Sequence, residues 1–140
     1  MPWTTKLLVV ANQTANSDEL VQHLVDRAER GQIEVTLVVP SDRGGREAAR
    51  QRLGLALKRM RDAGLWADGA IGDGEPVHAV LDAYDPHEHD EIVVSTFPAR
   101  LSRWVGCDVP HRIAQATGAL VRHVEAAERP SSSAWTRRAA

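Results

Sequence analysis

The chain has 140 residues, of which 43% are hydrophobic and 26% charged, and its formal net charge is -2. This length and composition fit one soluble globular domain and exclude a chain that is disordered throughout. The small negative charge excludes the basic field that drives non-specific nucleic-acid binding, and with one Phe and one Tyr the chain offers single strands little to stack on.

The sequence also carries signals about cell compartment. Cys107 is the only cysteine, which excludes an intrachain disulfide framework and fits a reducing environment. The first apolar run ends at the polar ANQT, so it is too short for the core of a signal peptide, and no run approaches the length of a membrane span. We therefore expect a cytoplasmic protein with no membrane or nucleic-acid partner.

The first predicted element is a strand over residues 6–11. Its sequence, KLLVVA, is apolar without alternation, which is typical of a parallel strand covered on both faces and makes it the candidate for the central strand. Apolar residues at helical spacing follow. Either Asn16, with Glu19 three residues on, or Ser17 can cap this helix, and Gly31 ends it.

The next two strands enclose a longer helix. Residues 33–39 are β-branched and apolar and predict a strand, and a helical pattern then runs between Arg46 and Gly64. The basic residues clustered over 43–61 have helical spacing, which favours a solvated helix face. Residues 65–71 alternate more than the other strands, as expected for the edge of a sheet.

The second half repeats the alternation of strand and helix. A turn, GDGE, precedes Pro76 at a first helical position, and Asp108 and Gly118 are the predicted start and stop of the last helix. The remaining strands and the last helix are predicted at residues 91–95, 119–124 and 109–117.

This order of elements predicts an α/β fold of three layers. Five parallel strands joined by four helices make a doubly wound, Rossmann-like sheet, and a central first strand gives the strand order 3-2-1-4-5. We expect a single domain over residues 1–124 and a flexible tail over 125–140. The carboxyl ends of strands 1 and 4 then line the crevice where such sheets bind ligands.

Three segments carry a resemblance to a known family. These are LLVVANQT, GDGEPVHAVLDA and DEIVVSTFPARLSRWVGCDVPHRIAQATGALVRHV. Together they resemble the universal stress protein family from Lys6 to Val124. The resemblance implies the fold described above, a homodimer formed through the last strand between Ala119 and Val124, and in one subgroup the binding of ATP with little conventional catalysis.

The chain departs from the ATP-binding subgroup at the loop after the fourth strand. That subgroup has Gly-x-x-Gly there and a later Gly-Ser or Gly-Thr, because glycines let backbone N–H groups approach phosphates. This chain has STFPAR over residues 95–100, and Pro98 lacks an N–H donor. Gly106-Cys107 stands where the later pair falls. The sequence thus predicts a degenerate ATP site.

Two kinds of residue make up the predicted binding site: strand-end residues of the crevice and residues of the loop after strand 4. Arginine in this loop can clamp phosphate or carboxylate in a fork geometry; the alternative is that the loop arginines are solvated or pair with Asp108 and Glu91. No cofactor is certain, and ATP or another adenine nucleotide is the candidate. The predicted binding residues are Ala11, Asn12, Thr14, Val39, Gly72, Ser95, Thr96, Arg100, Arg103, Gly106 and Cys107.

Neither a catalytic residue nor a metal site is predicted. A lone cysteine such as Cys107 is more often a small buried hydrophobe than a nucleophile, although its place near a helix start leaves the second reading open. The run HEHD over residues 87–90 lacks the spacing of zinc ligands and indicates a solvated linker. His111 lies near the expected crevice in the first turn of the last helix.

Three functions are compatible with these features. The first is a non-catalytic universal-stress-type homodimer that binds a nucleotide or another small anion in the crevice. The second is an enzyme that acts on a phosphorylated or acyl small molecule in the same crevice. The third is a pure protein-interaction module.

Overall fold

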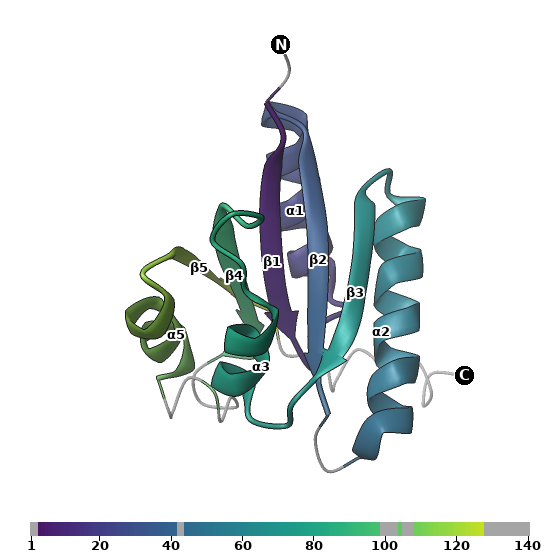
Figure 1. Ribbon diagram of the computed structural model, residues 1–140. Coiled ribbons are helices and arrows are strands. Elements are labelled where there is room, and N and C mark those ends of the chain that lie inside the picture. The colour runs from purple at the N-terminus through teal and green to yellow at the C-terminus, as the bar shows by residue number, and fades with distance from the viewer. Residues whose placement is uncertain (1–2, 42–43, 99–103, 105–107, 128–140) are drawn as a thin grey trace, which may run out of the picture.

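The computed structural model describes residues 3–41, 44–98, 104 and 108–127. Its strands are β1 (Thr5–Ala11), β2 (Ile33–Pro40), β3 (Trp66–Gly72), β4 (Glu91–Thr96) and β5 (Leu120–Glu125). Its helices are α1 (Asp18–Arg30), α2 (Gly45–Asp62), α3 (Pro76–Ala83) and α5 (Val109–Thr117). The strands form one five-stranded parallel sheet in the order β3-β2-β1-β4-β5, which confirms the predicted topology (Figure 1).

β1 is the central strand of this sheet. Val9 lies opposite Leu37 of β2 on one side and opposite Val93 of β4 on the other. From Leu7 to Ala11 every side chain of β1 is fully buried. The unbroken apolar run follows from this position, because both faces of a central parallel strand are covered by helices.

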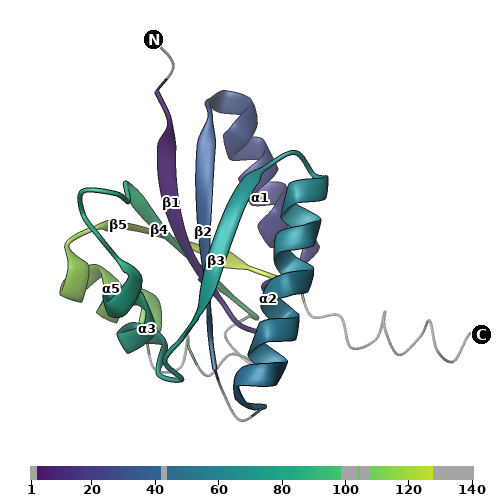
Figure 2. The same ribbon diagram turned by 45° about the vertical axis from the view of Figure 1, so that its right-hand side comes forward.

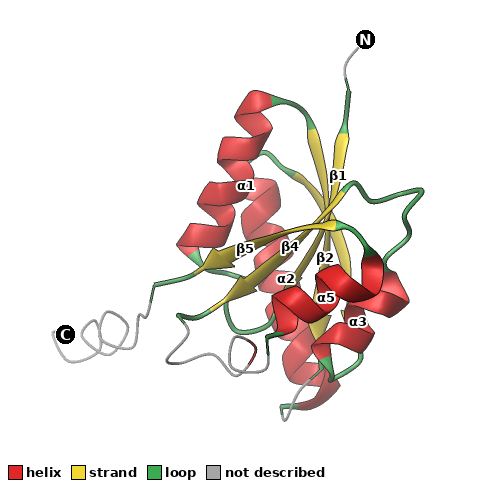
Figure 3. Cartoon of the chain, turned by 90° about the vertical axis from the view of Figure 1, so that its left-hand side faces the viewer, coloured by secondary structure: helices red, strands yellow, loops and turns green. Residues whose placement is uncertain are grey.

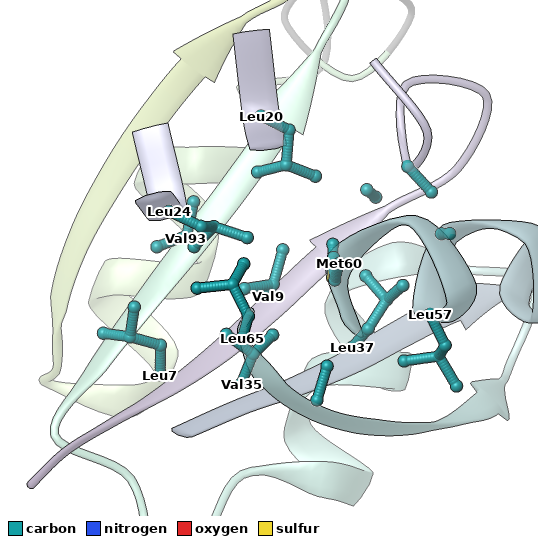
Figure 4. Packing of buried hydrophobic residues seen from close by; sticks show 14 of the residues in the cluster. Leu7, Val9, Leu20, Leu24, Val35, Leu37, Leu57, Met60, Leu65 and Val93 are labelled. Carbon is teal, nitrogen blue, oxygen red and sulfur yellow. The ribbon is translucent and has the colours of Figure 1, made fainter. Parts of the chain in front are cut away.

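Helices cover both faces of the sheet and make two cores. α1 and α2 lie on one face, and α3 and α5 lie on the other (Figures 2 and 3). Alternate residues of β1 feed the two cores: Leu7 and Val9 pack with Leu24 beneath α1 and α2 (Figure 4), whereas Leu8 and Val10 pack beneath α3 and α5. The partly buried Trp104 packs against the second core.

The helix ends test the predicted caps. Ser17, not Asn16, is the N-cap of α1, and its hydroxyl accepts a hydrogen bond from the N–H of Leu20 at 3.1 Å. Gly118 ends α5 in the left-handed conformation with φ 70°, as predicted. Asp108 precedes α5, but its prediction as a capping side chain is wrong: its own backbone is left-handed (φ 54°) rather than extended, and its carboxylate makes no cap hydrogen bond.

The two edge strands are the least buried. In β3 and β5 exposed residues alternate with more buried ones, and Trp66 and Leu120 are exposed at opposite edges of the sheet. Packing also continues past the predicted end of the domain at residue 124. Ala126 is buried, and its N–H donates to the carbonyl of Thr96 at 2.8 Å.

Candidate functional site

The predicted binding residues gather at one edge of the sheet, which we call the carboxyl edge because all five parallel strands end there. The strand order reverses between β1 and β4, so these two strands end side by side, and Ala11 pairs with Ser95. The described members of the predicted set are Ala11, Asn12, Thr14, Val39, Gly72, Ser95 and Thr96. Arg100, Arg103, Gly106 and Cys107 lie outside the described residues.

A buried hydroxyl pair joins the loop after β1 to the end of β4. The Thr14 and Ser95 side-chain oxygens lie 2.7 Å apart, and the two residues are 3% and 1% exposed. Each hydroxyl therefore satisfies the other where water does not reach. This pair fixes the loop between β1 and α1, and neither hydroxyl reaches solvent.

Thr96 points to the opposite face of the sheet from Ser95, because successive residues of a strand alternate. Its hydroxyl lies 2.7 Å from the Phe97 carbonyl and 2.6 Å from His123 Nε2. The His123 tautomer sets which of the two side chains donates across this contact, because a neutral imidazole has one N–H and one bare nitrogen. Thr96 is 3% exposed, so its hydroxyl lies beneath the surface of the carboxyl edge.

No motif in the sequence singles out His123. It lies in β5, and its contact depends on the register that sets His123 opposite Val94 and so on the same face as Thr96. His111, the histidine that sequence reasoning favoured, is an exposed residue of α5. Strand register is thus the signal that could have identified His123.

Gly72 ends β3 and owes its identity to packing. A Cβ atom at this position would lie 2.7 Å from the Ala79 Cβ and 2.9 Å from a Val38 methyl group. Such distances are shorter than van der Waals contact permits, so glycine lets α3 approach the sheet closely. Of the other predicted residues, Ala11 and Val39 are fully buried, and Asn12 is partly exposed.

Asn12 has a partner that was not predicted. Arg52 of α2 donates from Nη1 to the Asn12 side-chain oxygen at 2.6 Å. Two turns further along α2, Arg59 donates to the Asn16 carbonyl at 2.7 Å and also pairs with Asp18. Two arginines of α2 therefore hold the loop that leads out of the central strand.

These bonds revise the interpretation of the basic cluster over residues 43–61. Lys58 and Arg50 form exposed ion pairs along the helix, as a solvated face would. Arg52, Arg59 and Arg61 instead reach neighbouring elements, and Arg61 donates from Nε to the Ala67 carbonyl of β3 at 2.9 Å. Arg52 and Arg59 attach α2 to the loop after β1, and Arg61 attaches it to β3.

The opposite, amino edge of the sheet carries a charged cluster. Arg27 of α1 donates to both oxygens of Glu91 at 2.9 and 2.8 Å, and Arg122 of β5 donates to the same carboxylate at 3.0 Å. The Arg27 hydrogen bonds, with help from Arg122, hold the pKa of Glu91 below its ordinary value. Arg27 and Arg122 thus bond to both oxygens of Glu91, and neither of them belongs to the loop after β4.

The HEHD run forms a turn bonded to its surroundings. The Nδ1 atom of His89 accepts from the Asp85 N–H at 3.0 Å, and the His89 ring stacks on Tyr84. Asp90 accepts from the Lys6 N–H at 2.8 Å. Within the part of the chain that the structure describes, no three His, Cys, Asp or Glu side chains are grouped to hold a metal ion. The described helices likewise include none with the length and apolarity needed to cross a membrane.

Comparison with solved structures identifies the fold. A universal stress protein from Archaeoglobus fulgidus in complex with dAMP aligns over 89% of this chain and 100% of its own, with a TM-score of 0.63 and 16% identity. A further structure of a universal stress protein from Archaeoglobus fulgidus aligns over 86% and 93%, with a TM-score of 0.63 and 18% identity. A universal stress protein in complex with cAMP aligns over 90% and 99%, with a TM-score of 0.63 and 19% identity.

Sequence comparison adds no closer relationship. No protein-family model matches the chain, and no curated protein does. The structural neighbours nevertheless span nearly the whole domain, and their fold includes the strand order and the alternating helices described above. The chain therefore has the fold of the universal stress proteins.

Proposed function

We propose that this chain is a non-catalytic, homodimeric module of universal-stress type that binds an adenine nucleotide, or another small anion, at the carboxyl edge between β1 and β4. The observation that carries the proposal is the pairing of Ala11 with Ser95, by which two central strands end together and are followed by polar residues. Parallel α/β sheets bind ligands where the strand order reverses in this way. Neighbours of the same fold are in complex with dAMP and cAMP, which supports an adenine nucleotide as ligand.

The hydroxyl groups at this edge support binding without turnover. Thr14 and Ser95 bond to each other, and Thr96, which contacts the Phe97 carbonyl and His123, is only 3% exposed. A nucleophilic hydroxyl needs access to substrate and an adjacent base. Among the described residues of the carboxyl edge, no hydroxyl combines the two.

Adenine nucleotides are expected to stabilise the native protein. Because they bind the folded state selectively, a concentration of a hundred times Kd raises the free energy of unfolding by about 2.7 kcal/mol. Thermal denaturation with AMP, cAMP and ATP at millimolar concentrations, each compared with its guanine counterpart, measures this effect. An unchanged Tm with all of the adenine nucleotides would contradict nucleotide binding, and conversion of any of them, followed by chromatography, would contradict the absence of turnover.

The proposed dimer forms through the edge strand β5 and not through the other edge strand, β3. At the β3 edge, Arg61 donates to the Ala67 carbonyl, and the Asp68 carboxylate accepts from the Gly69 N–H at 2.8 Å, so side chains already occupy backbone groups that a second strand would need. In the described chain, no side chain bonds to the backbone of β5 (Leu120–Glu125). Antiparallel pairing of two β5 strands about a two-fold axis would satisfy that edge.

The dimer proposal predicts different effects at the two edges. Leu120 and Trp66 are 54% and 57% exposed, on β5 and β3 respectively. When two β5 strands pair antiparallel over their full length, Leu120 lies opposite Glu125 of the second copy, so Leu120→Glu sets like charges opposite each other and should weaken the dimer by about tenfold or more, whereas Trp66→Glu should leave it unchanged. Light scattering over a range of protein concentrations measures both. A wild-type monomer at all concentrations, or a dimer broken by Trp66→Glu alone, would refute pairing through β5.

A further inference from the structure

Arg52 lies where the proposed ligand site begins. Asn12 directly follows the central strand, and Arg52 reaches it from α2, forty positions along the chain. The 2.6 Å bond between Arg52 Nη1 and Asn12 Oδ1 orients the guanidinium at the carboxyl edge, and both residues are partly exposed. The loop to which Arg52 bonds is fixed in turn by the buried contact of Thr14 with Ser95.

The charge of Arg52 is not neutralised in the way that its neighbours are. On the same helix, Arg50 pairs with Glu47, Lys58 with Asp62, and Arg59 with Asp18. Arg52, by contrast, has a neutral amide as its partner and forms no ion pair among the described residues. A guanidinium has five N–H donors, and this bond uses one.

We propose that Arg52 binds the anionic group of the ligand, a phosphate ester, at the carboxyl end of β1. A partly buried guanidinium with a neutral partner has lost part of its hydration without gaining a counter-charge. A phosphate group supplies that negative charge. Its planar array of donors matches two phosphate oxygens, while Asn12 holds the side chain in place. This inference rests on the proposed function and assigns recognition of phosphate to α2, not to a glycine-rich loop.

Arg59 distinguishes phosphate recognition from simple attachment of the loop. It also reaches the loop between β1 and α1, through the Asn16 carbonyl, but the Asp18 carboxylate already balances its charge. If α2 arginines merely anchored this loop, the removal of either side chain would have similar consequences for ligand binding. If Arg52 recognises phosphate, only its removal changes the response to a phosphate group.

The test compares adenosine, AMP and inorganic pyrophosphate by calorimetry with the wild type, Arg52→Met and Arg59→Met. The wild type should bind AMP about tenfold or more tightly than adenosine, because a charge-assisted pair adds that much affinity. Arg52→Met should reduce this preference to less than about threefold, whereas Arg59→Met should keep it. Retention of the preference in Arg52→Met, or its absence from the wild type, would overturn the inference and leave nucleotide binding intact.

Pyrophosphate separates the inference from the proposed function. If the wild type binds pyrophosphate but neither adenosine nor AMP, and Arg52→Met abolishes that binding, the nucleotide proposal fails and the role of Arg52 stands. If the wild type binds none of the three probes, both are overturned. Thermal denaturation of the two variants without ligand confirms that each is folded before its binding is measured.

Discussion

Leu24→Ala is expected to lower the free energy of unfolding by about 2–5 kcal/mol. Leu24 is fully buried in the core beneath α1 and α2, together with Leu7 and Val9 of the central strand (Figure 4). Truncation removes apolar contacts and leaves a cavity that a sheet held on both sides cannot fill by collapsing. Urea denaturation at fixed pH and fixed protein concentration measures the loss.

Leu55→Ala is the matched control for this substitution. Leu55 also lies in a helix, α2, but is 61% exposed, so the same change of side chain removes little buried area. Its effect should stay within about 0.5 kcal/mol. Equal losses at the two positions would mean that Leu24 is not part of a closely packed core.

Glu91→Gln is expected to lower the free energy of unfolding by about 2–3 kcal/mol near neutral pH. The Glu91 and Arg27 side chains are 13% and 14% exposed, and the carboxylate accepts three hydrogen bonds from Arg27 and Arg122. The amide keeps the shape of the carboxylate but loses its charge, and it can accept through only one oxygen. Arg27 is then left partly buried without a counter-charge.

The effect of Glu91→Gln should depend on pH. The pKa of Glu91 is lower in the folded chain than its ordinary value of 4.5, so the carboxylate stabilises the fold fully above that pH and loses this effect as the pH falls through the folded pKa. The difference between wild type and Glu91→Gln should therefore close in acid. Burial and Arg27 also lower the pKa of His23 from 6.5. The stability that the neutral His23 contributes therefore begins to be lost below pH 6.5, and this loss is common to both proteins.

Glu88→Gln supplies the control for charge alone. Glu88 forms an ion pair with Lys6 at 3.6 Å, and its side chain is 59% exposed. Solvent screens such a pair, so its loss should cost about 0–1 kcal/mol. Urea denaturation between neutral and acid pH compares the three proteins. If the difference in the free energy of unfolding between wild type and Glu91→Gln does not decrease in acid, the role of the ionised carboxylate is contradicted.

The sequence predicted the fold because the fold depends on local patterns. The unbroken apolar run of β1 identified a central strand, and the alternation over residues 65–71 identified β3 as an edge strand. Ser17 caps the start of α1 through its hydroxyl, and Gly118, which has no Cβ, ends α5 in the left-handed conformation. Asp108 stands at the start of α5 as predicted, but its carboxylate makes no cap hydrogen bond, because the backbone conformation of a capping position is set by the whole turn and cannot be read from one residue type.

The candidate site was less predictable because its contacts depend on register and helix placement. Asn12 was identified from its position after β1, but its partner Arg52 comes from a helix whose basic residues were predicted to face solvent. His123 meets Thr96 only because β5 pairs with β4 in one particular register. Residues that lie far apart in sequence give no periodic signal of such contacts.

The Glu91 cluster also bears on the rate at which the protein unfolds. Arg27 and Arg122 belong to the first helix and the last strand, so the cluster is complete only when nearly the whole chain has folded. Interactions that form after the folding transition state slow unfolding and leave the folding rate almost unchanged. A cluster that forms late in folding therefore lengthens the lifetime of the native state, and the carboxylate at the start of β4 joins the first helix to the last strand.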